Sequence, residues 1–173
     1  MRIETERLIL REYREDDAKA LAAIICDPET MKYYEKPYDE AGVKRWIDWN
    51  LENYQTYGFG LWAIERNGRF IGDCGITIQN INRRFRPEIG YHIHRDFQRM
   101  GYASEAAAKC RDFIFSNTPF MAVYSYMNAD NVASYRTAEK IGMRLVETYA
   151  DSGIPHRVYR ITRDEWEKLP RQE

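Results

Sequence analysis

The dipeptide Asn67-Gly68 lies between two runs of alternating apolar residues, and it restricts the fold more than any other feature of the sequence. An Asn-Gly pair between such runs is a strong signal for a tight β-hairpin, because both turn positions need a backbone with positive φ, which Asn and Gly accept. We therefore predict strands over residues 61–65 and 70–78. Strands joined by so short a turn must run antiparallel, so at least part of the sheet is antiparallel.

Helical segments separate several of the remaining strands and add strand–helix–strand connections to the hairpins. We predict further strands over residues 7–13, 88–94, 120–127, 143–149 and 156–162. We predict helices after Asp16 and Asp17, over 39–58, 104–115 and 131–142, and after Thr162, which forms a capping box with Glu165. This order indicates an α/β fold with a mixed, mostly antiparallel central sheet flanked by helices. The chain shows no repeat and no linker, so we expect one domain over residues 1–173.

Length, charge and cysteine spacing exclude several classes of protein. The 173 residues suffice for a hydrophobic core without disulfides or metals, and 26 basic residues balance 27 acidic ones, which makes nucleic-acid binding an unfavoured function. No long uncharged apolar run is present, so we expect no membrane span. The three cysteines, Cys26, Cys74 and Cys110, lack metal-site spacing and suit a reducing compartment. Because the first residues also lack a hydrophobic leader, we expect a cytoplasmic protein that holds no metal.

The clearest candidate for anion binding is the loop between strand 88–94 and the next helix, Gln98-Arg99-Met100-Gly101-Tyr102-Ala103-Ser104. Small residues at 101 and 103 allow a ligand to approach the backbone, and the first amides of a helix have no acceptor within it. The loop is therefore a candidate for binding a phosphate or pyrophosphate, with Arg95 or Arg99 adding charge. A helix start that needs small residues only for packing would give the same pattern. The loop matches neither the dinucleotide motif GxGxxG nor the phosphate loop GxxxxGKS/T.

A second polar pair, Asn131 and Ser134, lies at the predicted start of the helix over 131–142. An amide and a hydroxyl at this position are able to bind the amide and the thiol of a pantetheine chain. The alternative is purely structural, with Asn131 as the N-cap of the helix and Ser134 as a first-turn residue.

Taken in order, these segments resemble the GNAT acetyltransferase superfamily. Residues 98–103 are similar to its pyrophosphate loop, Q/R-x-x-G-x-G/A, and residues 131–134 with 139–143 are similar to its second cofactor-binding helix and the strand that follows. The opening residues 4–11, ETERLILR, resemble the ribosomal-protein-alanine N-acetyltransferase (Rim) type within that superfamily. The resemblance extends over nearly the whole chain.

The resemblance implies an acetyl-CoA-dependent N-acetyltransferase whose sheet splays into a V between strands 88–94 and 120–127. Pantetheine would pair with the backbone of the first of these strands, and the loop over 98–104 would hold the pyrophosphate. The implied acetyl-CoA-binding residues are Tyr91, His92, Ile93, Gln98, Arg99, Met100, Gly101, Tyr102, Ala103, Ser104, Asn131 and Ser134. The acceptor would be a primary amine, on a protein N-terminus or on a small molecule, and the protein would be a monomer or a homodimer.

Two catalytic roles need residues. Many relatives carry a Tyr seven residues after the Asn as general acid, but this chain has Ala138 there, so the role passes to Ser134, with Tyr135 as an alternative. The attacking amine must also lose a proton. Alternation along strand 88–94 places Glu88, His92 and His94 on one side as candidate bases, and we favour Glu88.

The acceptor and even the presence of catalysis stay open at this stage. An α-amine has a pKa of about 7.7–8.0 against about 10.4 for a lysine, and no strong base stands out, so we expect an α-amine to be preferred. A non-catalytic acyl-CoA-binding sensor or scaffold would carry the same loop, but it would release no thiol with any amine. Trp46 and Trp49 fit either an acceptor pocket or the buried face of their helix. The basic run over 83–86 is expected as an exposed turn.

Overall fold

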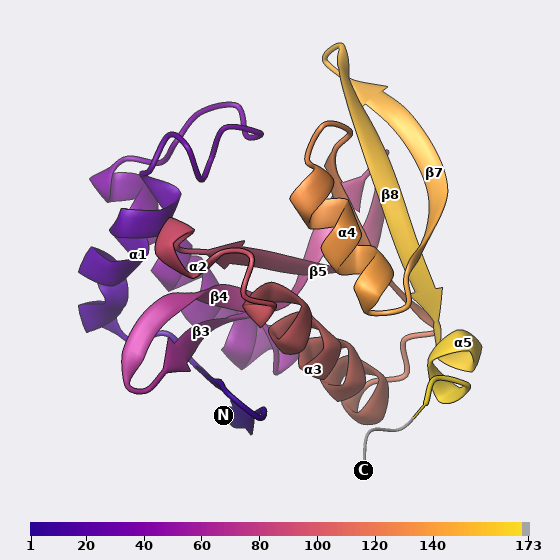
Figure 1. The fold of residues 1–173 in the computed structure, drawn as a ribbon, viewed down its shortest axis with the longest axis horizontal. Helices are drawn as coiled ribbons and strands as arrows, with labels where there is room; N and C mark the ends of the chain where they lie inside the picture. Colours follow the sequence, from indigo (N-terminus) through magenta and orange to yellow (C-terminus); the bar gives the residue numbers. More distant parts are fainter. Residues whose placement is uncertain (171–173) are drawn as a thin grey trace.

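The structure is a computed structural model that describes residues 1–170 (Figure 1). The last three positions of the expected domain, 171–173, lie outside the described residues. Within 1–170, eight strands form one sheet in the order β1-β2-β3-β4-β5-β6-β8-β7. The strands are β1 (Arg2–Glu4), β2 (Ile9–Arg11), β3 (Leu61–Arg66), β4 (Arg69–Ile81), β5 (Arg84–Ile93), β6 (Ala122–Asn128), β7 (Arg144–Asp151) and β8 (Ile154–Thr162). The helices are α1 (Ala18–Ile25), α2 (Glu40–Tyr57), α3 (Tyr102–Asn117), α4 (Val132–Lys140) and α5 (Arg163–Glu167), with short 3-10 turns at Glu15–Asp17 and Arg95–Phe97.

The mixed, mostly antiparallel sheet flanked by helices is confirmed, and so is its division into two halves. Among the described strands, β5 and β6 form the one parallel pair, and their register contains a single position, Glu88 opposite Tyr124. On either side of this junction the pairing is extensive, over ten positions between β4 and β5 and seven between β6 and β8. In Figure 1 the half formed by α4, β7 and β8 stands apart from the half formed by α1, α2 and β3–β5. The sheet is thus open between β5 and β6 beyond Glu88.

The turn that first defined the fold lies where it was predicted. Asn67 and Gly68 both have positive φ, 51° and 75°, and join β3 to β4. The expected basic turn over 83–87 is wrong. The turn consists of Asn82 and Arg83, which have φ of 48° and 63°, so β5 already begins at residue 84. As a result Arg86 is only 8% exposed.

Local signals set the ends of α2 but not the start of α1. The Asp39 carboxylate accepts a hydrogen bond from the amide of Gly42 at 2.7 Å, and Gly58 ends the helix with a φ of 76°, as predicted. The expected capping of α1 by Asp16 and Asp17 is wrong, because no side chain caps that helix. The Asp17 carboxylate instead accepts hydrogen bonds from both terminal nitrogens of the Arg11 guanidinium, each at 2.7 Å. Asp17 thus forms an ion pair with Arg11 rather than a helix cap.

Helices cover both faces of the β3–β5 half. Trp62 and Ile64 of β3 belong to the core on the α3 side, whereas Leu61 and Ala63 belong to the core under α1 and α2. This alternation places the two helical layers on opposite faces. Cys74 lies fully buried in the α3-side core, as expected for an inert thiol. No helix within residues 1–170 is both long and apolar enough to cross a lipid bilayer.

Candidate functional site

Two cavities open along the gap between β5 and β6, and they meet in the middle. The first, of about 770 Å³, lies among α2, residues 27–39, β6 and the β7–β8 hairpin; we call it the aromatic cavity. The second, of about 590 Å³, lies among residues 27–39, the start of α3 and α4; we call it the basic cavity. Six residues line both: Tyr33, Tyr34, Tyr91, His92, Asn131 and Ser134. A ligand that lies across this shared group would reach from one cavity into the other.

The start of α3 gives the basic cavity a set of backbone donors. Gly101 precedes the helix with a φ of 84°, and a side chain there would meet only the Arg7 guanidinium, at 3.3 Å. The first hydrogen bond of the helix runs from the Glu105 amide to the Gly101 carbonyl. The amides of the three residues between them, Tyr102, Ala103 and Ser104, therefore have no acceptor within the helix, and all three residues line the cavity. This is the geometry expected of an anion site at a helix N-terminus.

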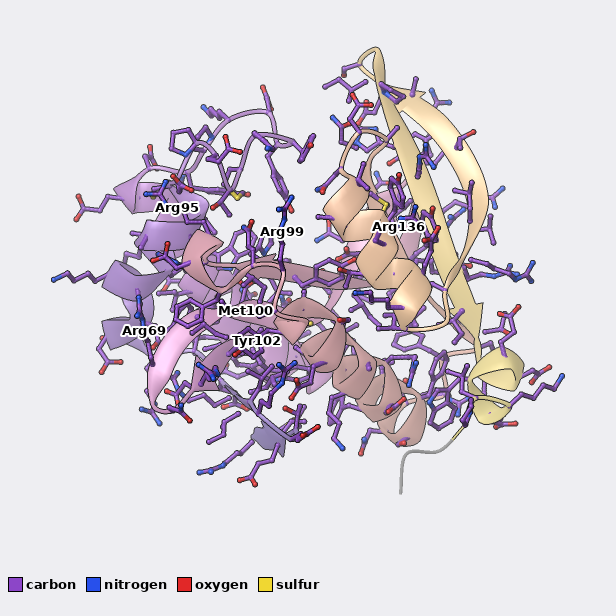
Figure 2. All side chains as sticks on the ribbon, viewed as in Figure 1. Arg69, Arg95, Arg99, Met100, Tyr102 and Arg136 are labelled. Atoms are coloured by element: carbon purple, nitrogen blue, oxygen red, sulfur yellow. The ribbon has the colours of Figure 1, made fainter. Side chains whose placement is uncertain are left out.

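Basic side chains surround these donors. The residues that give the cavity its name are Lys32, Arg95, Arg99, Arg136 and Lys140. Glu29 is the acid that lines it, and its carboxylate already pairs with Lys32 at 2.7 Å. Figure 2 shows Arg95 and Arg99 on the segment that leads into α3 and Arg136 on α4, across the gap. A polyanionic ligand fits this environment.

The loop residues reach the basic cavity in different ways. Gln98 lines it and donates from Nε2 to the Ile93 carbonyl at 2.9 Å, which ties the loop to the end of β5. Arg99 lines it with a positive φ of 62°. Met100 does not belong to the lining of either cavity, and its carbonyl accepts from Arg7 at 3.1 Å. Any part that Met100 plays in the loop would thus come from its backbone amide.

Two members of the shared group, Tyr34 and His92, belong to a chain of hydrogen bonds that leads to the buried Asp73. His92 Nδ1 lies 2.8 Å from the Asp73 carboxylate, and its Nε2 lies 2.8 Å from the hydroxyl of Tyr34. The other oxygen of Asp73 accepts from the Tyr13 hydroxyl at 2.6 Å and from the Trp46 indole at 3.0 Å. Because a carboxylate only accepts, Nδ1 carries the hydrogen, and in the neutral imidazole Nε2 accepts from Tyr34. The ring orientations along this side are therefore fixed.

Neither Asp73 nor Tyr34, the two hydrogen-bond partners of His92, was predicted from the sequence. Asp73 is completely buried within β4, where it is the one charged residue in the apolar stretch over 70–78. That isolated charge was the available signal, because a buried carboxylate requires partners. Burial alone would lower the pKa of His92, but the Asp73 carboxylate against its ring outweighs this effect and the pKa is raised. The imidazole is thus a stronger base than an ordinary histidine.

Glu88 lies at the junction of the two halves and lines the aromatic cavity. Its side chain is 8% exposed, and burial raises its pKa to about 8, while His92 and Thr77 oppose the rise and Asp73 adds to it. The hydroxyl of Thr77 donates to Oε2 at 3.4 Å. A side chain on Gly90 would lie only 3.0 Å from the same oxygen, so the carboxylate occupies space that the glycine leaves open. Glu88, the predicted base, is thus a buried carboxyl group whose pKa lies near neutral pH.

Asn131 is the N-cap of α4, and both Asn131 and Ser134 face the cavities. The Asn131 side chain accepts from the Ser134 amide at 3.2 Å, which is the N-cap interaction, and both residues also line both cavities. The Ser134 hydroxyl lies 3.4 Å from the Tyr91 hydroxyl, which itself donates to the Ser134 carbonyl at 2.7 Å. The neighbouring Tyr135 lines neither cavity and stacks on Tyr159, with ring centroids 6.2 Å apart. The serine, rather than the adjacent tyrosine, faces the gap.

His94 lines neither cavity, unlike Glu88 and His92. β5 ends at Ile93, and His94 caps the following 3-10 helix, where its Nδ1 accepts from the Asp96 amide at 3.3 Å. Among the candidate bases, Glu88 and His92 therefore remain beside the gap. Trp46 and Trp49, for which a core position was favoured, both line the aromatic cavity. Within residues 1–170, no three His, Cys, Asp or Glu side chains are arranged to hold a metal ion.

Comparison with known proteins places the chain among acetyltransferases. Residues 7–144 match the family described as "Acetyltransferase (GNAT) domain". The uncharacterized protein YkkB of Bacillus subtilis strain 168 is 37% identical over 158 residues, which cover 90% of this chain and 92% of YkkB. The uncharacterized N-acetyltransferase YoaA of the same organism is 32% identical over 151 residues, 82% of either chain.

Solved structures share the fold over almost the whole length. An acetyltransferase from Agrobacterium tumefaciens str. C58 matches with a TM-score of 0.82 at 28% identity, and the match covers 93% of this chain and 94% of that one. RimL, a ribosomal L7/L12 alpha-N-protein acetyltransferase solved in complex with coenzyme A, matches with a TM-score of 0.78 at 18% identity, covering 94% and 98%. At that identity the likeness to RimL shows the fold alone.

Proposed function

Because this chain belongs to the GNAT acetyltransferase family, whose chemistry is acetyl transfer from acetyl-CoA, we propose that it acetylates a primary amine by direct attack of the amine on the thioester. The amine belongs to a protein N-terminus or to a small molecule, and the chain acts as one domain in the cytoplasm. One observation carries the proposal: a basic and an aromatic cavity meet at a shared group of polar residues. Two such cavities suit two substrates of opposite charge, an anionic cofactor and a cationic amine, that must meet to react.

The basic cavity fits coenzyme A. Free amides at the start of α3 and the cations Arg99 and Arg136 suit its phosphates. Gly101 supports this assignment, because it lines the cavity at the start of α3 with a positive φ of 84° that glycine adopts without strain. Beyond Glu88 the backbone of β5 has no partner on β6, so residues 91–93 are open to the amides of pantetheine. The predicted cofactor residues over 91–93, 98–104, Asn131 and Ser134 form this proposed binding region.

The residues of the chain would act at three atoms: the nitrogen of the amine, the carbonyl oxygen of the thioester and its sulfur. Acetyl-CoA supplies the acetyl thioester. The Glu88 carboxylate takes the proton that the amine loses as its nitrogen bonds to carbon, and a backbone amide of β5 donates to the carbonyl oxygen as charge develops there. The Ser134 hydroxyl gives its proton to the departing sulfur and regains one through Tyr91 or water. His92 lies four residues along the same strand from Glu88 and influences its charge.

Substitution of Gly101 tests the cofactor assignment. Gly101→Val strains a backbone with a φ of 84° and adds a branched side chain to the loop that lines the basic cavity, so the affinity for acetyl-CoA should fall by about tenfold or more. Gly68→Val is the matched control, because Gly68 has a similar positive φ of 75° but lines neither cavity. Both variants should lose similar stability, and calorimetric titration should show an affinity loss only for Gly101→Val. Equal affinities in the two variants would refute the assignment.

Release of free thiol separates an enzyme from a sensor. With acetyl-CoA and a panel of peptides, amino acids, diamines and aminoglycosides, the protein should release coenzyme A in step with acetylated amine. A protein that binds acetyl-CoA tightly but releases no thiol with any member of the panel would be a non-catalytic acyl-CoA-binding module.

A further inference from the structure

We propose that the acceptor is a compact organic dication, meaning a primary amine that carries a second positive charge a few carbon atoms away. The inference rests on the proposed acetyl transfer and names the substrate class of the same site. It is drawn from the charge, the rings and the volume of the aromatic cavity.

The two cavities carry charge of opposite sign. Whereas five basic residues line the basic cavity, the aromatic cavity is lined by three acids, Glu35, Glu88 and Asp151. The one lysine or arginine in its lining is Arg45, whose guanidinium lies 3.7 Å from the Asp39 carboxylate. The exposed carboxylates of Glu35 and Asp151 therefore attract cations to the aromatic cavity, within a chain whose total charge is nearly balanced.

Aromatic rings flank this cavity on both sides of the gap. On the α2 side, Trp46 packs against Tyr38 and against His92, each with centroids 5.3 Å apart, and Tyr34 packs against His92 at 5.5 Å. On the other side, Tyr126 of β6 packs against His156 of β8 at 6.2 Å. A cation within about 6 Å of the face of a Trp or Tyr ring is stabilised by the ring electrons.

The α2-side rings are held in place before any ligand arrives. The Trp46 indole donates to the buried Asp73 carboxylate, and the same carboxylate fixes the His92 ring. Tyr34 is 46% exposed and Tyr38 is 38% exposed, so both present surface to the cavity rather than to the core. Rings fixed in this way lose little conformational freedom when a cation binds.

Two acids in the cavity lining, Glu35 and Asp151, favour an acceptor that carries a second positive charge. The reacting amine attacks in its neutral form and gives a proton to Glu88 as its nitrogen bonds to carbon, so it brings no charge to the other acids. Glu35 and Asp151 remain, one on residues 27–39 and the other at the end of β7, and both are exposed. Within residues 1–170, no basic side chain forms an ion pair with either of them. A second ammonium group on the acceptor would neutralise them.

Two features favour a small molecule over a polypeptide. The volume of about 770 Å³ lies in the range of small-molecule sites, about 300–1,000 Å³. Glu88 is a buried carboxyl group in the lining of this cavity, so the acceptor has a candidate base beside it. An aliphatic amine of higher pKa is therefore an acceptable substrate.

Matched acceptors test the proposal directly. Cadaverine has two amines on a five-carbon chain, pentylamine lacks the second charge, and 6-aminohexanoate reverses it. At saturating acetyl-CoA, kcat/KM from thiol release should be about tenfold or more higher for cadaverine than for pentylamine, and lowest for 6-aminohexanoate. A tripeptide with a free N-terminus should also be poorer than cadaverine. Equal values for the two amines, or preference for the peptide, would overturn the proposal.

Variants connect the preference to the named acids. The double variant Glu35→Gln with Asp151→Asn should reduce the ratio of kcat/KM for cadaverine to kcat/KM for pentylamine to about one. Asp48→Asn is the control, because it removes a negative charge from the exposed face of α2, outside both cavities. A preference that survives the double variant would contradict the assignment of these acids.

A binding measurement distinguishes this proposal from the acetyl-transfer function. Pentamethonium carries two quaternary ammonium ends on the same chain and cannot be acetylated. Calorimetry should detect its binding to the native protein and a weakening of about tenfold in the double variant. If pentamethonium binds but no amine is acetylated, the cavity assignment holds and the proposed transfer fails. If amines are acetylated but pentamethonium does not bind, the dication proposal fails alone.

Discussion

Glu88 combines burial with a position on the reacting side of the gap, and this determines how the rate should depend on pH. Its pKa of about 8 means that the carboxylate able to accept a proton forms only as the pH approaches 8. The rate of acetyl transfer should therefore rise with pH and level off above about pH 8. Glu88→Gln should remove this rise and lower the plateau rate by about 10²–10⁴-fold. Stopped-assay rates from pH 6 to pH 9.5 measure both effects, and an unchanged profile in the variant would assign the base elsewhere.

Ser134 is expected to contribute more to protonation of the departing sulfur than to the affinity for acetyl-CoA. A hydrogen bond to a charged group contributes about 1.5–3 kcal/mol, so Ser134→Ala should lower kcat by about ten- to a hundredfold. The affinity for acetyl-CoA, measured by calorimetry, should change little. Asn131→Ala is the companion variant and should weaken binding more than turnover, because Asn131 caps α4 and lines both cavities. Wild-type turnover in Ser134→Ala would leave water as the proton donor.

At the scale of the elements, two strand glycines make a sharp comparison. A side chain on Gly90 of β5 would meet only the movable end of Glu88 at 3.0 Å, whereas one on Gly75 of β4 would lie 1.9 Å from the backbone carbonyl of Gly60. Gly90→Ala should thus keep its melting temperature but lose activity, because the Glu88 carboxylate must move. Gly75→Ala should lose stability. Thermal unfolding together with thiol release checks the pair, and an active Gly90→Ala would show that the carboxylate position is not critical.

The elements also show which parts of the structure can be predicted from the sequence. The ends of α2 and the β3–β4 turn were predictable, because Asp39, Gly58 and Asn67-Gly68 act on backbone only a few residues away. The loop before α3 was predictable for the same reason. The chain through His92 was not, because its partners lie 19 and 58 positions away, at Asp73 and Tyr34. Only the folded sheet and the return of residues 27–39 bring these groups together.

For the whole molecule, Glu88 links stability to pH. Between about pH 4.5 and 8 the folded protein keeps a proton on Glu88 that the unfolded chain has released, so rising pH lowers the free energy of unfolding by up to about 1.4 kcal/mol per unit. Glu88→Gln cannot ionise. The melting temperature of the variant relative to the native protein should therefore be higher at pH 9 than at pH 5. A difference that stays constant with pH would mean that Glu88 is ionised at low pH in the folded state.

The single pairing of Glu88 with Tyr124 has a geometric consequence for the passage of substrates. When two arms that meet at one point change the angle between them, each part moves in proportion to its distance from that point. A small rotation of one half of the sheet against the other would widen the mouth near Ile93 and Asn128 far more than it would displace Glu88. Reactants would thus pass through an entrance of variable width, while Glu88 stays at a nearly constant distance from both arms.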